Sequence, residues 1–324
     1  MKGPHHEVWY LKLNDPIKRR ALWLRFTVLM SRNGFRRVAE CWAVFFRQDA
    51  QDAKDTKLAL KQTYSIDRFS ASGESNVKIG ECLLEGDRTS GKVQSKGHTI
   101  EWDFKMAPRQ NASFNMVPPP LAKIGLVKNK AVTVNEDLTF TGTAKIDGEE
   151  FEWNQAPGMQ GHLRGPKNGQ SWVWGHCNSF VDENGKDAPF IFDGLTARAR
   201  IAGGIVTPRL SSFYFFYKGK HYRLNSLRNA VHLRSKSTLT DWQFRADQGE
   251  ISFRGHMKAD HKDFAGLTYE DTNGSLLYCA NSKLSDLQVH VYRHGKLESS
   301  FYGNKTAAFE IVSRQKNPYV QLLI

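Results

Sequence analysis

Hydrophobic and polar residues alternate in many short segments of this chain, and turn residues separate the segments. Alternation with a period of two places successive side chains on opposite faces of a β-strand. The segments are also rich in β-branched and aromatic residues, which strands favour. They include ALWLRFTVLM (21–30), VAECWAVFF (38–46), HTIEWDFKM (98–106), LTFTGTAKI (138–146) and SSFYFFYKG (211–219). The pattern predicts an all-β protein with many short strands.

Hairpin turns are indicated between several of these segments. Asn-Gly or Asp-Gly dipeptides occur at 33–34, 147–148, 184–185 and 273–274, and such dipeptides are typical of two-residue hairpin loops. Helical periodicity is scarce, and residues 49–62 are the best candidate for a short helix. We therefore expect an antiparallel sandwich or barrel with few short helices.

Two tryptophan-rich segments each lead a series of predicted hairpins. One is EVWYLKL (7–13) and the other is SWVWGHCNSF (171–180). Between them, residues 156–170 are dense in glycine, which is typical of an irregular crossing between domains. The sequence therefore predicts an N-terminal β-domain, residues 1–155, and a C-terminal β-domain, residues 156–324.

The segment 171–180 has two faces of different character if it is a strand. Small residues and a valine occupy one face. The other face is large and carries Trp172, Trp174, His176, Asn178 and Phe180. Polar groups among aromatic rings need partners in a dry core. This face is therefore either the lining of a pocket for a bulky apolar ligand or core that contains two polar members.

Composition places the chain among soluble globular proteins. Its 324 residues include 40% hydrophobic and 12% aromatic residues, enough for one large or two ordinary domains. No apolar run approaches the roughly 18 to 20 residues of a membrane helix, and the N-terminus lacks a secretory signal. The four cysteines are scattered, and no histidine pair has a third metal ligand nearby. We expect a cytoplasmic protein without a metal site.

The formal net charge of +13 is spread along the chain, with small clusters at 17–20 and 32–37. A solvated surface is the first interpretation, and peripheral contact with anionic membranes is the second. No helix-turn-helix, RNP-like or zinc-finger pattern is present. Nucleic acid is therefore not an expected partner.

Residues 148–180, GEEFEWNQAPGMQGHLRGPKNGQSWVWGHCNSF, resemble the central segment of tocopherol cyclase. Residues 5–29 resemble the opening strand of that family, and 217–225 and 305–312 match it more loosely. The resemblance implies membership of a superfamily that includes carotenoid 1,2-hydratase, AttH-like proteins and lipocalin-like Diels–Alderases. It implies a fold of two tandem lipocalin-like β-barrels packed together. It also implies cofactor-free chemistry on prenylated or polycyclic apolar substrates.

Several positions depart from the family pattern. Val8 stands where the opening motif has glycine, and two histidines precede Glu7 where an aromatic residue is usual. His176 replaces a glutamine, and His162 stands where the cyclases have an Asn-Trp pair. Because these positions are where the substrate would be handled, the cyclase substrate is not carried over to this chain.

Cyclisation or hydration of an alkene needs a proton donor and a dry, aromatic cavity that stabilises a carbocation. The candidate ligand-binding aromatic residues are Trp9, Trp172 and Trp174, with the polar-tipped Tyr10, Tyr214 and Tyr217. Ordinary barrel core is the alternative role for each of them.

Glu7 is the best candidate acid, because burial in its apolar strand would raise its pKa toward a value useful for protonation. The alternative is a strand-edge carboxylate beside two histidines. His162 and His176 could donate protons or orient a carbonyl group, or they could be structural. Gln160 and Asn178 lie near them in the sequence as further ligand-binding candidates.

We therefore expect a protein that binds a large apolar ligand, isoprenoid or polycyclic, near the junction of two β-barrels. The favoured function is cofactor-free cyclisation, hydration or isomerisation of that ligand. The alternative is a non-catalytic lipid or isoprenoid carrier on the same fold.

Overall fold

Antiparallel strands make up nearly all of the regular structure of this protein. The computed structural model describes residues 3–48, 56–118, 128–200, 205–226 and 229–324. No α-helix occurs in these ranges, and the short 3-10 helices include Ile66–Arg68, Ala230–His232 and His261–Asp263. The predicted all-β fold with few short helices is confirmed.

The first sheet has the strand order β4-β3-β2-β1-β12-β11-β9-β8-β7-β6-β5, and β10 pairs with β11. It curls into a barrel, since Gln94 N on β8 donates to Gln62 Oε1 on β4 at 3.1 Å. Its strands are β1 (His5–Asp15), β2 (Arg20–Met30), β3 (Arg37–Arg47), β4 (Lys57–Ser65), β5 (Phe69–Ser72), β6 (Asn76–Ile79), β7 (Cys82–Glu85), β8 (Arg88–Ser95), β9 (His98–Pro108), β10 (Phe114–Asn115), β11 (Lys130–Ile146) and β12 (Glu149–Gly165).

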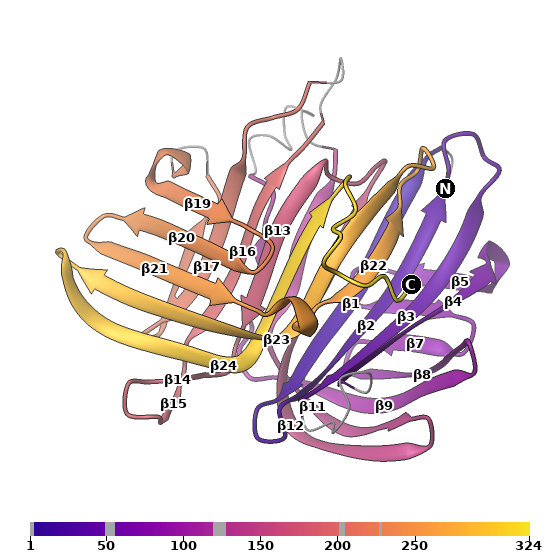
Figure 1. Cartoon of the computed structure of the whole chain (residues 1–324), viewed down its shortest axis with the longest axis horizontal. Coiled ribbons are helices and arrows are strands. Elements are labelled where there is room, and N and C mark those ends of the chain that lie inside the picture. Colours follow the sequence, from indigo (N-terminus) through magenta and orange to yellow (C-terminus); the bar gives the residue numbers. More distant parts are fainter. Residues whose placement is uncertain (1–2, 49–55, 119–127, 201–204, 227–228) are drawn as a thin grey trace.

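The second sheet has the order β18-β17-β16-β13-β24-β23-β21-β20-β19, with β14, β15 and β22 attached to it. Thr196 Oγ1 on β16 donates to Ser235 Oγ on β19 at 2.8 Å, so this sheet also curls. Figure 1 shows the two curved sheets packed against each other. The strands are β13 (Ser171–Cys177), β14 (Phe180–Val181), β15 (Asp187–Ala188), β16 (Ile191–Arg198), β17 (Leu210–Tyr217), β18 (Lys220–Leu224), β19 (Leu233–Ser237), β20 (Asp241–Gln248), β21 (Ile251–Lys258), β22 (Ala265–Glu270), β23 (Leu276–Arg293) and β24 (Lys296–Ser313).

The predicted turn dipeptides lie between strands. The turn between β11 and β12 contains Asp147 with φ +50° and Gly148 with φ +89°, as a type I′ hairpin requires. The dipeptides at 33–34, 184–185 and 273–274 connect β2 to β3, β14 to β15 and β22 to β23.

The predicted short helix over 49–62 is wrong where the structure describes it. Residues 57–62 belong to β4, which pairs with β3 from Lys57–Phe46 to Ser65–Val38. Pairing with a buried neighbour outweighs local helical preference here. Residues 49–55 lie outside the described part of the chain.

The glycine-dense segment is mostly strand rather than a crossing loop. Residues 156–165 continue β12, which pairs with β1 and β11 in the first sheet. A side chain at Gly158 would place its Cβ 2.2 Å from Lys12 O, and one at Gly161 would come within 2.1 Å of the Tyr10 ring. Glycine is therefore needed for close packing within the strand. The chain passes between the sheets at 166–170. The division into domains 1–155 and 156–324 stays a prediction.

Buried side chains form one core inside each barrel and a third layer between them. Trp9 lies in the first barrel's core and Tyr217 in that of the second. The third layer, which we call the between-barrel layer, joins Tyr10 and Trp23 of the first sheet to Trp174 and other residues of the second. Strand β1 thus contributes alternate residues to two different cores.

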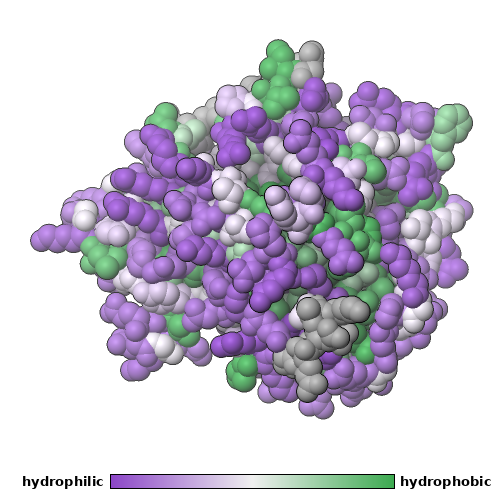
Figure 2. All heavy atoms as spheres, in the orientation of Figure 1, coloured by the Kyte–Doolittle hydropathy of each residue, from purple (hydrophilic) through white to green (hydrophobic). Residues whose placement is uncertain are grey.

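Hydrophilic residues cover most of the face of the molecule shown in Figure 2, and hydrophobic residues occupy smaller areas between them. No helix in the described ranges is long and apolar enough to cross a membrane.

Candidate functional site

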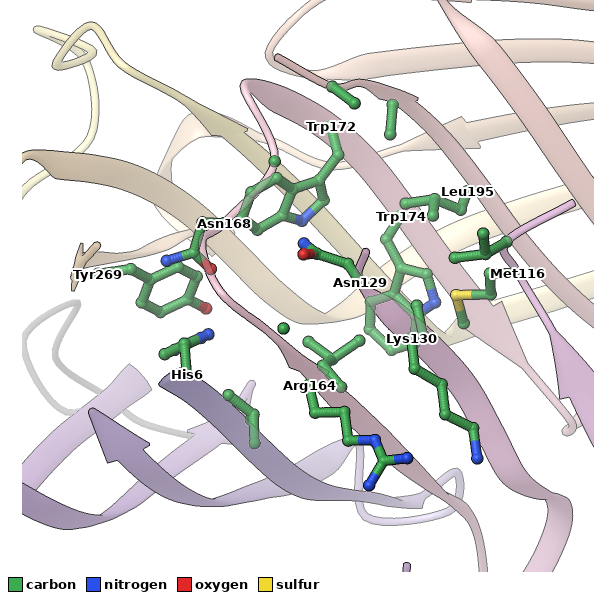
Figure 3. A pocket seen from close by; sticks show the side chains of 18 of the residues that line it. His6, Met116, Asn129, Lys130, Arg164, Asn168, Trp172, Trp174, Leu195 and Tyr269 are labelled. Atoms are coloured by element: carbon green, nitrogen blue, oxygen red, sulfur yellow. The ribbon is translucent and has the colours of Figure 1, made fainter. Parts of the chain in front are cut away.

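A pocket of about 200 Å³ lies between the two barrels. The first barrel lines it with residues of β1, β2, β11 and β12, and the second with residues of β13, β16, β22 and β24. Its aromatic walls are formed by Tyr10, Trp23, Trp172, Trp174 and Tyr269. Figure 3 shows Trp172, Trp174 and Tyr269 arranged around the cavity. The pocket therefore combines an aromatic wall with polar and charged side chains such as Arg25, Lys130 and Glu310.

The pocket's aromatic rings are held by contacts with one another. The Trp172 ring stacks on Tyr269 at 6.4 Å and 12°. The Tyr10 ring meets Trp174 edge to face at 5.7 Å, a favourable arrangement for the ring quadrupoles. Tyr10, Trp172 and Trp174 thus lie together at the barrel junction, and their role in ligand binding stays a prediction.

Both pocket tryptophans of β13 donate their indole N–H to a buried carboxyl group. Trp172 Nε1 donates to Glu310 Oε1 at 3.1 Å, and Trp174 Nε1 donates to Asp193 Oδ1 at 2.9 Å. The strand register explains both bonds as diagonal contacts between neighbouring strands. Glu310 on β24 pairs with Trp174, two residues from Trp172, and Asp193 on β16 pairs with His176, two residues from Trp174. Alternation puts all of these residues on one face.

A polar chain continues from Glu310 behind the tryptophans. Asn281 Nδ2 donates to Glu310 Oε2 at 3.2 Å, and Lys283 Nζ donates to Asn281 Oδ1. The Lys283 ammonium also lies 5.6 Å from the centre of the Trp174 ring. Burial lowers the Lys283 pKa to about 8, although the nearby charge of Glu310 opposes this change. Lys283 therefore stays mostly charged at neutral pH but loses its proton more readily than an exposed lysine.

Asp193 and Glu136 form a buried pair of acidic residues. Burial raises the Asp193 pKa to about 6, although hydrogen bonds from Thr133 and Trp174 oppose the rise. Burial and the charge of Asp193 raise the Glu136 pKa well above its ordinary value. A hydrogen bond with Asp193 also raises the Glu136 pKa, and Glu136 Oε2 lies 3.5 Å from His176 Nε2. At neutral pH this pair therefore holds a proton on Glu136.

His176 and Asn178 are buried and bond to residues of the first sheet, but they do not line the pocket. His176 Nε2 donates to the backbone oxygen of Glu136 at 3.0 Å, and Asn178 Nδ2 donates to Gly158 O at 2.9 Å. Burial, together with the charge of Lys12, lowers the His176 pKa well below its ordinary range. The expectation that both residues face the cavity is therefore wrong.

Strand geometry explains part of this difference. Strand β13 ends at Cys177, so Asn178 no longer follows its alternation. Phe180 lies instead in the core of the second barrel, where Cys177 also lies. The predicted common face holds only from Trp172 to His176.

Glu7 and His162 face the interior of the first barrel, away from the pocket. His162 Nε2 lies 2.9 Å from Glu7 Oε1, and the His162 ring stacks on Trp9 at 5.1 Å. Burial raises the Glu7 pKa, but hydrogen bonds from His162 and His5 outweigh it and lower the value to about 2. The expected rise is therefore wrong, because the two histidines stabilise the carboxylate. Gln160 joins this group and donates to Glu74 O at 3.2 Å.

The two remaining tyrosine candidates lie apart from each other. Tyr214 belongs to the between-barrel layer, packs on Phe114 at 5.7 Å and bonds His221 Nδ1 through its hydroxyl at 2.8 Å. Tyr217 lies in the second barrel's core, where its hydroxyl is 2.9 Å from Ser299 Oγ. Neither one lines the pocket.

Sequence reasoning missed nine polar residues that line the pocket: His6, Arg25, Asn129, Lys130, Arg164, Lys167, Asn168, Arg198 and Glu310. Burial and the charge of Arg25 lower the His6 pKa to about 3, so this imidazole is neutral. Alternation from Tyr10 could have placed His6 on the pocket face of β1. Arg25 and Glu310 had a signal too, since each interrupts an apolar strand, ALWLRFTVLM and AAFEIV.

The described residues contain no group of three or more His, Cys, Asp or Glu side chains that could hold a metal ion. Cys41, Cys82, Cys177 and Cys279 are all buried and free. Burial raises the pKa of the Cys177 thiol.

Known proteins resemble this chain along most of its length. Two uncharacterised proteins of Mycobacterium tuberculosis, from strains CDC 1551 / Oshkosh and H37Rv, are each 21% identical over 291 residues, which is 88% of this chain and 80% of the relative.

Three solved structures share the fold. A structure described as AttH from Nitrosomonas europaea has a TM-score of 0.52 and 13% identity, and covers 95% of this chain and 92% of its own. Kievitone hydratase from Nectria haematococca has a TM-score of 0.54 and 10% identity, with 95% and 88% coverage. CghA in complex with Sch210972 has a TM-score of 0.55 and 10% identity, with 97% and 90% coverage.

These likenesses support the arrangement of two tandem lipocalin-like barrels. The family model described as tocopherol cyclase-like matches residues 62–311. That range extends from β4 of the first barrel to β24 of the second, and so includes most strands of both. The chain therefore belongs to the tocopherol cyclase-like family.

Proposed function

We propose that this protein binds an apolar isoprenoid or polycyclic compound in the pocket between the barrels and catalyses its cyclisation, hydration or isomerisation without a cofactor. The family membership and the likeness to a hydratase support this class of reaction. The pocket volume of about 200 Å³ suits a compact ring system or the reacting end of a longer molecule.

The observation that carries the proposal is the pairing of both β13 tryptophans with buried carboxyl groups. Hydrogen bonding to a carboxylate increases the electron density of an indole ring. Such a ring face stabilises a nearby positive charge more strongly, and the effect grows when water is excluded. Trp172 and Trp174 therefore suit a reaction whose transition state has carbocation character.

Glu310 is the acidic residue among those that line the pocket, and its oxygens accept hydrogen bonds from Trp172 and Asn281. We therefore assign it, as a carboxylate, the role of the base that accepts the proton lost by the carbocation. Asp193 and Glu136 lie behind Trp174 and hold their proton away from the cavity. Tyr10 contributes a neutral phenol, because burial and the charge of Asp193 raise its pKa well above the ordinary value.

The test is incubation of the purified protein with prenylated phenols, polyenes and polycyclic enones, followed by mass spectrometry of the products. Glu310→Gln should reduce the rate of product formation by roughly a hundredfold or more while ligand binding, measured by tryptophan fluorescence, persists. Glu298→Gln on the same strand changes an exposed carboxylate and is the control. Ligands that bind but return unchanged with every variant would identify a carrier instead and refute the catalytic proposal.

A further inference from the structure

Arg25 on β2 is a buried cation in the pocket wall without a protein anion to neutralise it. Only 5% of its surface is exposed, and it lines the pocket. Its guanidinium lies 4.0 Å from the centre of the Tyr269 ring and 4.9 Å from that of Trp42. Among the described residues no ion pair involves Arg25, and its Nη1 is buried without a hydrogen-bond partner.

Arg20 on the same strand is a buried arginine with protein partners, and it can be compared with Arg25. It is also 5% exposed, and its guanidinium lies 4.8 Å from the centre of the Trp153 ring. It differs in its partners, because it forms an ion pair with Asp15 at 3.1 Å and donates to Glu152 O. Burial of an unpaired charge is costly. The missing partner of Arg25 therefore needs an explanation.

The other polar residues of the pocket do not supply that partner. Glu310 is the one carboxylate among the lining residues, and Trp172 and Asn281 occupy its oxygens. His6, beside Tyr269 in Figure 3, is neutral. The wall formed by β1 and β2 therefore presents a positive charge to whatever enters the pocket.

We infer that Arg25 binds a compact oxyanion, a carboxylate or a phosphate, carried by the apolar ligand. This inference rests on the proposed function, because it concerns the same pocket. A guanidinium presents N–H groups in a fork that matches two oxygens of such an anion. The aromatic walls would then hold the apolar part. The substrate class is thus an acid with a ring or prenyl body rather than a neutral hydrocarbon.

Three ligands with the same ring test the inference: 2-naphthoate, 2-naphthyl phosphate and the neutral 2-naphthylmethanol. Calorimetry at fixed ionic strength measures their binding to the full chain. Wild-type protein should bind at least one anion roughly tenfold or more tightly than the alcohol. The more tightly bound anion distinguishes a carboxylate from a phosphate ligand.

Arg25→Met should abolish this preference while the alcohol still binds, and its melting temperature should equal or exceed that of the wild type. The matched control, Arg20→Met, should lower the melting temperature and keep the preference for the anion. The inference is overturned if wild-type protein binds the alcohol as tightly as both anions, or if Arg25→Met keeps the preference. Binding of the alcohol without such a preference would leave the proposed apolar pocket intact, whereas a failure of all three to bind would contradict both proposals.

Discussion

Replacing Asp193 by asparagine should change the dependence of stability on pH. Asp193 is fully buried beside Glu136, and burial raises its pKa from the ordinary 3.8 to about 6. Between these values the folded protein binds a proton that the unfolded chain has already released. The free energy of unfolding must therefore fall as the pH rises from about 4 to about 6.

The size of this effect follows from the pKa difference. The Asp193 pKa rises by about two pH units, and each unit corresponds to about 1.4 kcal/mol. Ionisation of Asp193 should therefore lower the free energy of unfolding by about 3 kcal/mol across this range. Asparagine keeps an oxygen that can accept the Trp174 N–H but cannot ionise. Asp193→Asn should therefore gain stability relative to the wild type as the pH increases, by an amount of this order.

Urea denaturation at half-unit intervals from pH 4 to pH 8 measures this difference. The control is Asp103→Asn, which changes a half-exposed carboxylate paired with Arg88 and should leave the difference from wild type constant. If the Asp193→Asn and wild-type curves stay parallel over the whole range, Asp193 does not titrate as the structure implies, and its part in the acidic pair must be abandoned.

Three further changes test other parts of the molecule. Glu7→Gln should flatten the loss of stability at acid pH, because the Glu7 pKa of about 2 lies below its ordinary 4.5 and its contribution is lost as the pH falls through that interval; equal slopes in acid denaturation would contradict this. Gly161→Ala should lower the free energy of unfolding, measured by urea denaturation, by about 1–3 kcal/mol, since the new Cβ meets the Tyr10 ring at 2.1 Å. The control Gly169→Ala meets nothing closer than 3.4 Å and should change the free energy of unfolding little. The charge of +13 should promote binding to phosphatidylserine vesicles that weakens as salt is added, and cosedimentation that is equal at low and high salt would exclude this contact.

Local patterns were sufficient for the fold class but not for every segment. Period-two alternation and the Asn-Gly and Asp-Gly dipeptides predicted the strands and hairpins, because both signals arise from local backbone geometry. Residues 57–62 were misassigned because the partner that makes them a strand, β3, is a tertiary neighbour. Residues 156–165 were misassigned because their glycines allow close approach of Lys12 and Tyr10, which the sequence cannot display.

The site was predicted in part for a similar reason. Alternation correctly grouped Trp172 and Trp174, but the same rule separates Glu7 and Trp9 from Tyr10 on β1, and the sequence interpretation placed all three together. Which face of β1 meets the second barrel depends on how the sheets pack. The acidic pair joins positions 136 and 193 on strands of different sheets, and no local signal predicts such a contact.

The pocket separates two charges, and this separation yields a final prediction. An oxyanion at Arg25 lies on the wall of β2, whereas a cation forming over Trp172 and Trp174 lies on the wall of β13, where Glu310 and Asp193 accept the indole hydrogens. Binding of the anion and stabilisation of the transition state therefore depend on different residues. Trp174→Phe should lower kcat and leave the preference for an anionic ligand unchanged, whereas Arg25→Met should remove that preference and raise KM more than it lowers kcat. If both variants change the same parameter to the same extent, the two walls do not act separately.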